Sequence, residues 1–452
     1  SYKKIEDILD EIENIALLEN YEFIDIDVSE SIVSKNKINF LFNVKESKNV
    51  YVNKVNIFGN NITSEAYIRN NLIVDEGDPL NKLLQKKSIN NLKSKGLFKS
   101  VSYEIKDTED DLKKDIDLFI EEKPTGEISA GAGYGTDGSS FSVGIKENNF
   151  NGKGISLSTN IELREDSIRG ALYYTNPNFA YSDRALTTSI ESLVTDKLTD
   201  SGYKTNLHQV SLGTRYEQFD DLFFSPSFSI ASETVETSSN ASAAYKKQEG
   251  SYFDTYVNYG LTYDKRNLRY QPTDGFVSRW YQELPLISNN SSIINSYSIT
   301  NYSELADNMV LSTGIYLKAV NSLDNEDVRV SKRLYIPSKR LRGFESGKVG
   351  PKDGDDFVGG NYVTTVNAST TLPYILESME NVDVKVFLDV GNIWGVDYDS
   401  TLDDSNKIRS SSGLALEILS PVGPISFSYA EAITKAATDV TESFKFQLGT
   451  TF

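Results

Sequence analysis

Residues 444–452 read Phe-Lys-Phe-Gln-Leu-Gly-Thr-Thr-Phe, and their side chains alternate strictly between two faces of an extended strand. One face is mostly apolar and carries Phe444, Phe446, Leu448, Thr450 and Phe452. An aromatic residue at the last position is unusual for a soluble chain, because chain ends fray into water. An apolar face that ends in an aromatic residue is typical of a barrel strand that reaches a membrane interface.

The composition of the 452-residue chain agrees with a membrane barrel. Hydrophobic residues make up only 38%, yet aromatic residues reach 11% and include 26 tyrosines, as expected when strand faces alternate between lipid and lumen. The formal net charge of −19 argues against nucleic acid as a partner. The sequence contains no cysteine, which leaves no disulfide or thiolate-metal framework. No stretch approaches the roughly 18 apolar residues of a transmembrane helix.

The region before Pro124 combines helical and strand patterns, and it predicts small α+β domains. Residues 49–124 predict a complete β-α-α-β-β domain in which Asp78 caps the second helix. Residues 1–48 read as the last helix and two strands of a preceding copy, which implies a repeat. The helical pattern begins directly after Ser1, so we expect any export signal to have been removed or to lie outside this sequence.

Residues 125–452 contain only strand patterns and predict a transmembrane antiparallel β-barrel of about sixteen strands, so the fold class is mainly β. Sixteen segments have the length of barrel strands, and they lie near residues 126–134, 138–147, 154–164, 168–176, 184–195, 204–218, 222–236, 251–264, 275–285, 296–306, 309–320, 361–373, 382–391, 411–419, 424–430 and 443–452. Their connections alternate between tight turns and long polar loops, as in outer-membrane barrels. A series of soluble β-sandwiches would not show this two-sided pattern of loops.

The longest connection, residues 321–360, is rich in glycine and arginine and also carries apolar residues. This composition favours a segment that folds back into the barrel lumen. In the strand at 382–391 the alternate valines must meet lipid, so Asp389 faces the lumen. A buried arginine of the loop would need a carboxylate partner, and Asp389 could supply one. A solvated surface loop with incidental basic residues is the alternative.

Several motifs together resemble those of BamA-type outer-membrane barrel assembly factors. Arg342-Gly343-Phe344, with Gly350-Pro351 and residues 359–362, is similar to the sixth outer loop of that family, and residues 387–394 resemble its following strand. Residues 50–123 resemble the barrel-proximal POTRA domain. The resemblance implies a barrel in the bacterial outer membrane, with POTRA domains in the periplasm, that folds and inserts other barrels. It also implies that Arg342 reaches Asp389 inside the lumen.

The resemblance further implies partners and exposes two departures from the family pattern. The implied partners are unfolded outer-membrane proteins, accessory lipoproteins of a barrel assembly complex, periplasmic chaperones and outer-membrane lipid, with no cofactor, metal ion or nucleic acid. No acidic residue occurs between Gly360 and Leu376, so Asp389 would be the main carboxylate for Arg342, with Ser369 at best a hydrogen-bond partner. Asn71 stands near the position where the family often carries an acid that contacts an accessory lipoprotein.

The first barrel strand is poor in bulky side chains, because Gly131 and Gly133 interleave with alanines. Glycine weakens a strand, so its pairing with the last strand, which carries Gly449, predicts a weak seam. Unpaired N–H and C=O groups at such a seam are available to another chain. We therefore expect a nascent barrel protein to add its terminal strand there, and the family's sorting signal resembles residues 444–452. The alternative is that the glycines only allow curvature.

Three other functions fit parts of this pattern. A passive porin would need neither the β-α-α-β-β unit nor the Arg-Gly-Phe loop. A transporter for two-partner secretion or for translocation and assembly shares both features and is the main alternative. An outer-membrane lipase would need a nucleophile and a base, but the sole histidine, His208, lies near one end of a strand and reads as a polar interface residue. We therefore expect a protein that is not an enzyme.

Overall fold

The computed structural model describes residues 2–448 except 20, 22, 35–36, 137, 183, 200, 240, 270, 373–381, 403 and 421–422. Two compact units make up the chain, one of residues 1–127 with 147–157 and the other of residues 128–146 with 158–452. Among the helices in the described ranges, none is long and apolar enough to cross a membrane.

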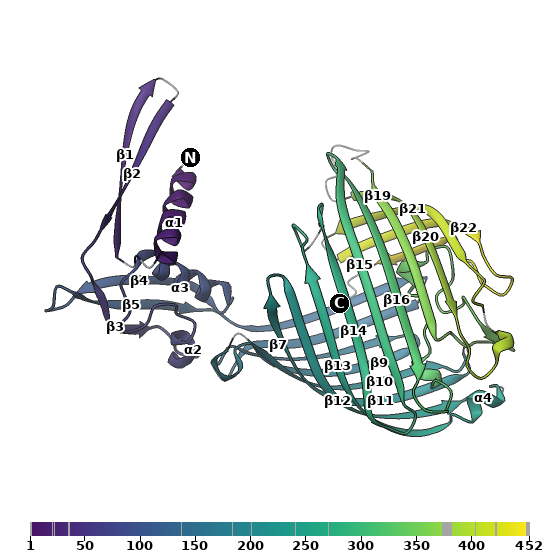
Figure 1. Ribbon diagram of the computed structural model, residues 1–452. Coiled ribbons are helices and arrows are strands. Elements are labelled where there is room, and N and C mark those ends of the chain that lie inside the picture. The colour runs from purple at the N-terminus through teal and green to yellow at the C-terminus, as the bar shows by residue number, and fades with distance from the viewer. Residues whose placement is uncertain are drawn as a thin grey trace. The chain divides into compact units, whose positions relative to one another are not determined.

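The N-terminal unit begins with helix α1 (Tyr2–Leu18) and an antiparallel pair, β1 (Ile24–Ser34) with β2 (Lys37–Glu46). A three-stranded sheet follows in the order β3-β5-β4, in which β3 runs parallel to β5 and β4 antiparallel to it (Figure 1). The elements of this β-α-α-β-β unit are β3 (Tyr51–Phe58), α2 (Glu65–Arg69), α3 (Lys82–Ser94), β4 (Phe98–Asp107) and β5 (Lys113–Glu122).

Apolar residues from both helices and the sheet form the core of this unit. Ile68 of α2, Leu92 of α3 and Leu118 of β5 are almost completely buried in one cluster. The predicted helix cap is wrong by three residues. Asn81, not Asp78, caps α3 by accepting a hydrogen bond from the Leu84 N–H, because Asp78 instead accepts from the Asp75 N–H within the preceding turn.

Sixteen strands form the barrel, which confirms the predicted fold, and each of them overlaps one predicted segment. Their bounds are β6 (Gly126–Gly135), β7 (Gly138–Phe150), β8 (Ile155–Arg164), β9 (Ser167–Asn176), β10 (Ala185–Lys197), β11 (Tyr203–Phe219), β12 (Leu222–Thr237), β13 (Gly250–Asp264), β14 (Gly275–Ser288), β15 (Ser292–Ala306), β16 (Met309–Ser322), β19 (Tyr362–Thr371), β20 (Val382–Trp394), β21 (Arg409–Ser420), β22 (Gly423–Thr434) and β23 (Phe444–Leu448). They follow one another around the barrel in chain order, and β23 returns to β6. The strands are tilted and enclose a lumen (Figure 1).

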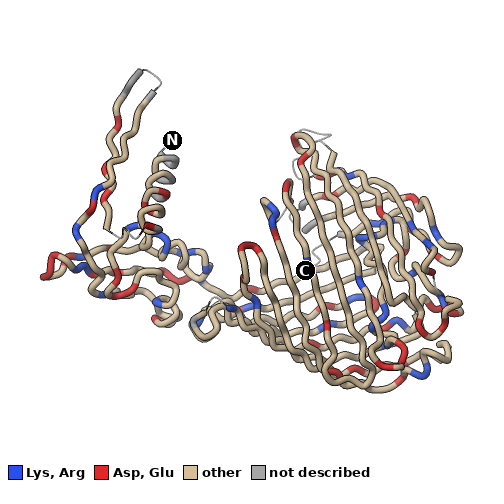
Figure 2. The backbone as a smooth tube through the Cα atoms, in the orientation of Figure 1, with Lys and Arg blue, Asp and Glu red and all other residues tan. Residues whose placement is uncertain are grey.

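The connections of the barrel contain a few short elements. These are α4 (Ala243–Lys246), the 3-10 turns η1 (Phe179–Tyr181), η2 (Val330–Lys332), η3 (Ser338–Arg340) and η4 (Ser400–Leu402), and the two-residue strands β17 (Lys352–Asp353) and β18 (Asp356–Phe357). We call residues 323–361, which join β16 to β19, the long loop. Acidic and basic residues lie close to one another around the long connections (Figure 2).

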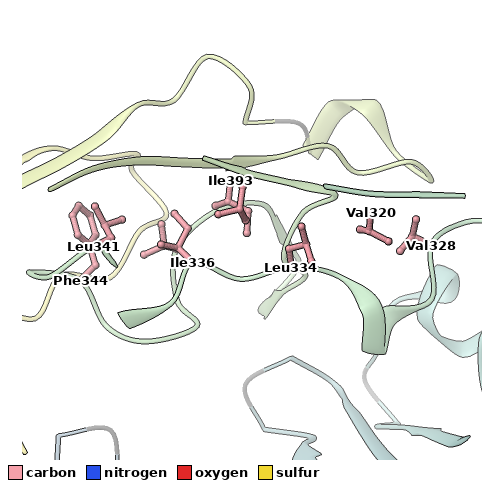
Figure 3. Close-up of a cluster of buried hydrophobic side chains, with 9 residues drawn as sticks. Val320, Val328, Leu334, Ile336, Leu341, Phe344 and Ile393 are labelled. Atoms are coloured by element: carbon pink, nitrogen blue, oxygen red, sulfur yellow. The ribbon is translucent and has the colours of Figure 1, made fainter. Parts of the chain in front are cut away.

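Side chains alternate along the barrel strands as the sequence predicts. In β20, Val386 and Leu388 are 41% and 45% exposed on the outer face, whereas Phe387 and Asp389 are 2% and 0% exposed on the inner face. The long loop packs against the inner face, where it forms an apolar cluster with the barrel wall. Figure 3 shows Leu341 and Phe344 at one end of this cluster, Ile336 beside Ile393 of β20, and Val320 of β16 at the other end.

Candidate functional site: the strand seam and the long loop

The seam between β6 and β23 is joined by few residues. Within the described residues, these strands share only the partner pairs Gln447↔Gly135 and Leu448↔Tyr134. One further hydrogen bond runs from the Thr136 N–H to the Phe446 carbonyl, at 3.3 Å. On its other side, β23 pairs with β22 along its whole described length. The barrel is therefore nearly closed, with an unsealed seam.

The glycines expected at the seam lie in the part of β6 that has no described partner in β23. Gly131 and Gly133 precede the two paired residues, Tyr134 and Gly135. Gly449, Thr450 and Phe452 lie outside the described residues, so their expected places on the last strand stay predictions. Among the described residues of β23, none pairs with β6 between residues 126 and 133. Unpaired backbone groups of a strand are groups to which another strand can add.

Arg342 of the long loop and Asp389 of β20 form a bidentate ion pair inside the barrel. Arg342 Nε lies 2.7 Å from Asp389 Oδ2, and its Nη2 lies 2.8 Å from Oδ1. The backbone N–H of Arg342 also donates to Oδ2, at 3.1 Å. The guanidinium lies 3.4 Å above the centroid of the Phe387 ring, which adds a cation–π contact. Since Asp389 is completely buried, this pairing is what keeps its charge compensated.

A third residue, Asn367 of β19, joins this pair and was missed by sequence reasoning. Asn367 lies directly opposite Asp389, and its Nδ2 donates to Asp389 Oδ1 at 2.8 Å and to the Arg340 carbonyl at 2.7 Å. Ser369, which was considered at best a hydrogen-bond partner of Arg342, lies opposite Phe387, and Asn367 takes the place beside the ion pair. A shift of two residues preserves the alternation of faces, so the sequence pattern could not reveal the error.

Gly343 and Phe344 bring the loop into close contact with β21, β22 and the connection after β22. Gly343 has φ +86°, and a Cβ atom there would lie only 3.1 Å from the Ala430 side chain and 3.2 Å from that of Ser411. Phe344 is 2% exposed and forms an isolated backbone bridge with Thr441. Position 343 therefore requires glycine both for its backbone conformation and for its lack of a side chain.

A second buried arginine, Arg329, binds the beginning of the long loop to strands β12 and β13. Its Nη1 lies 2.7 Å from Glu233 Oε2 of β12 and 2.8 Å from Asp254 Oδ2 of β13, and its Nη2 lies 3.1 Å from Asp254 Oδ1. The guanidinium also lies 3.8 Å from the centroid of the Tyr252 ring. Arg329 is 1% exposed. Alternation could have marked Glu233 and Asp254 as inward-facing acids in need of a cation, but not which arginine reaches them.

A third cluster links the long loop to the connections that flank β21 and β22. Arg409 of β21 donates to both carboxylate oxygens of Asp439, at 2.9 Å and 3.0 Å, and to Asp404 at 2.6 Å. Asp439 also accepts the backbone N–H of Gly350 from the loop. Arg409 is 0% exposed. Buried ion pairs thus hold the loop at Arg329 and Arg342, and the backbone N–H of Gly350 joins it to the buried Arg409–Asp439 pair.

Asn71, in the N-terminal unit, is a buried structural residue. It is 3% exposed, its Nδ2 donates to the Tyr67 carbonyl at 2.8 Å, and its own carbonyl accepts from Asn91 at 2.8 Å. The side chain stabilises the end of α2 and does not point into solvent. The expectation that Asn71 cannot form the ion pair that the resemblance implies with an accessory lipoprotein stays a prediction.

Glu122, at the end of β5, organises the turn before α2. Its carboxylate accepts the backbone N–H groups of Asn61, Ile62 and Thr63, at 2.9, 2.9 and 2.6 Å. Burial alone would raise the pKa of Glu122, but the hydrogen bonds from this turn outweigh it and lower the pKa. The carboxylate form therefore contributes stability above its unfolded-state pKa of about 4.3, and this contribution is lost as the pH falls through the lower folded pKa.

We expect Glu122→Gln to loosen this turn at pH 7, because the amide accepts hydrogen bonds less strongly than the carboxylate. Hydrogen exchange of the amides of residues 61–63 should be faster in the variant than in the wild type. The difference should begin to shrink below about pH 4, as the wild-type carboxylate becomes protonated. An equal difference at pH 7 and pH 3, after correction for intrinsic exchange, would contradict this role.

Comparison with known families gives matches for both parts of the chain. The model described as the Omp85 superfamily domain matches residues 126–452. The POTRA model, described as a surface antigen variable number repeat, matches residues 50–123.

Individual relatives agree with these matches. The outer membrane protein assembly factor BamA of Neisseria meningitidis is 25% identical over 98% of this chain, which spans 62% of the length of that relative. The crystal structure of BamA from Haemophilus ducreyi lacking POTRA domains 1–3 has a TM-score of 0.88 at 24% identity and covers 100% of this chain and 94% of that one. CdiB from Acinetobacter baumannii is less similar, with a TM-score of 0.55 at 14% identity over 94% of this chain and 78% of that one.

Proposed function

The chain belongs to the Omp85 superfamily, and from this membership we propose that it assembles and inserts β-barrel proteins into the bacterial outer membrane. In this account the barrel lies in the outer membrane and the POTRA region in the periplasm. The similarity to an outer membrane protein assembly factor extends over almost the whole chain. It favours this function over the secretion or translocation transporter considered above.

The observation that carries the proposal is the unsealed seam. A barrel strand with an unpaired edge presents N–H and C=O groups to a membrane interior that cannot hydrate them. A client strand that pairs with β6 satisfies those groups, so the seam acts as a lateral gate and a template. The glycines at positions 131, 133 and 449 keep the pairing with β23 weak enough to exchange. No catalytic side chain is needed for this reaction.

The long loop has a supporting role in the proposed mechanism. Arg342, Gly343 and Phe344 hold it against the strands β20 to β22, next to the last strand of the barrel. Through Asp389 and its partners, the docked loop keeps these strands in place while β23 separates from β6. We assign the terminal segment with Phe444, Phe446, Leu448 and Phe452 to the class of sequence that the protein recognises in its clients.

Partners follow from the same proposal. The clients are unfolded outer-membrane proteins, and accessory lipoproteins of a barrel assembly complex would bind the periplasmic POTRA region. Strand β4 lies at an edge of that region's sheet, because the order of the described strands is β3-β5-β4. Periplasmic chaperones could deliver an extended client to that edge.

A disulfide across the seam tests the function. The partner residues Gly135 and Gln447 are both replaced with cysteine. Because the sequence contains no other cysteine, no competing disulfide can form within the chain. Oxidation should abolish insertion of a client barrel into proteoliposomes, and reduction should restore it. The control is a cysteine pair at Ser428 and Lys445, which joins β22 to β23 one strand away and should leave insertion intact. Full activity of the oxidised seam variant would refute the gate.

A further inference from the structure

One side-chain contact crosses the seam on the lipid-facing side. The ring of Tyr134 in β6 lies 5.8 Å from the ring of Phe446 in β23, at an interplanar angle of 58°. Among the ring contacts of the described residues, this is the one that joins β6 to β23. Since the described residues of the two strands share two partner pairs, the aromatic contact forms a large part of their described interface.

Phe446 is also part of an aromatic row that continues away from the seam. Its ring stacks with those of Phe427 on β22 and Phe444 on β23, at centroid distances of 6.5 Å and 6.3 Å. Tyr134 is 62% exposed and extends this row onto β6. If β23 moved away from β6, Phe446 would leave with it and Tyr134 would lose its ring partner.

Tyr134 is the only aromatic residue of β6. On its outward face, Ile128, Ala130 and Ala132 precede it, and the inward face offers mainly small or polar residues. Main-chain pairing with an added strand is largely independent of sequence, whereas side-chain contacts give specificity. Tyr134 is therefore the position on this edge at which the side chain of an incoming strand can be distinguished.

We propose that Tyr134 is a specificity-determining residue that accepts an aromatic side chain from the strand that adds to β6. This inference rests on the proposed function, because it assumes that a client strand takes the place of β23. The client's aromatic residue then occupies the position that Phe446 holds in the resting barrel. The protein's own last strand thus acts as an internal competitor for the same subsite.

The expected gain is modest and measurable. An aromatic pair contributes about 0.5–1.5 kcal/mol beyond the area that it buries. This corresponds to a preference of roughly twofold to tenfold for a strand with an aromatic residue at this register. Main-chain pairing would still supply most of the affinity, so Tyr134 selects among strands and does not create the binding site.

A peptide exchange experiment tests the proposal. The full chain with Gly135→Cys is equilibrated in a thiol–disulfide buffer with a peptide of the sequence 442–452 that carries cysteine at the position of Gln447. A second peptide also has alanine at the position of Phe446. The aromatic peptide should form roughly twofold to tenfold more disulfide adduct than the alanine peptide. Tyr134→Ala should remove this preference, and Tyr134→Phe should retain it.

The control variant is Tyr429→Ala, which removes an outward tyrosine of similar exposure (54%) from β22, and the preference should survive it. Equal adduct yields of the two peptides with the Tyr134 chain would overturn the inference but leave the gate intact. No adduct with either peptide would refute the proposed function as well. If the Tyr134→Ala variant still preferred the aromatic peptide, another residue would be the one that contacts the aromatic side chain.

Discussion

Replacing Arg342 with alanine is expected to release the long loop from the inner wall of the barrel. The substitution leaves the carboxylate of Asp389 completely buried without a cation, and its described hydrogen-bond donors are then Asn367 Nδ2 and the backbone N–H of residue 342. Breaking a buried ion pair in this way costs about 3–5 kcal/mol. Because Arg342 itself retains some exposure, we expect a value near the lower limit, about 3 kcal/mol, or roughly a hundredfold increase in the undocked population.

Limited proteolysis of the loop in intact proteoliposomes measures this population. Arg340→Ala is the matched control, since it removes a neighbouring arginine whose guanidinium packs over the Tyr316 ring and has no ion pair among the described residues. The control should change cleavage much less than Arg342→Ala, and client insertion should fall only in the latter. Equal cleavage rates in the wild type and in Arg342→Ala would show that the ion pair does not hold the loop.

Replacing Arg329 with methionine is expected to have the other large effect. The change leaves Glu233 and Asp254 as two buried carboxylates on adjacent strands without the cation that lies between them. Both the uncompensated burial and the mutual repulsion oppose folding, so we expect a loss of about 3–5 kcal/mol. Refolding into lipid, followed by the shift of the folded band in electrophoresis, should show a lower yield and a lower melting temperature.

A compensated variant separates charge from packing. Arg329→Met combined with Glu233→Gln and Asp254→Asn removes all three charges, and neutral replacement of a buried ion cluster is often tolerated. We expect this triple variant to recover most of the lost stability. If it were as unstable as Arg329→Met alone, the role of Arg329 would be packing against Tyr252 and not charge compensation.

Much of the architecture could be predicted because a barrel strand repeats a simple rule. The alternation of lipid-facing and lumen-facing residues placed Asp389 inside the barrel, and the lengths of the connections separated its two rims. The alternation rule could not predict the register between neighbouring strands. Alternation is unchanged by a shift of two residues, so it could not show that Asn367, and not Ser369, lies beside the Arg342–Asp389 pair.

Contacts between segments that lie far apart in the sequence could not be predicted from the alternation pattern, for a different reason. Arg329 is separated from Glu233 by 96 residues and from Asp254 by 75, and no local periodicity encodes such a distance. Asn71 illustrates a further limit, because its burial depends on the packing of α2 against α3 and not on its own chemistry. The seam itself could be inferred from glycine content, but its aromatic contact depends on the register between the first and last strands.

The central claim is that a client strand pairs with the free edge of β6. The most direct measurement is disulfide scanning between single cysteines at Ser129, Gly131 or Gly133 and cysteines along the terminal strand of a client that is stalled during insertion. The account predicts adducts in one antiparallel register. When the cysteine of β6 moves two residues toward the C-terminus, the client position that reacts should move two residues toward the client's N-terminus. Adducts confined to inward-facing positions of other strands, such as Ser229 of β12, would contradict it.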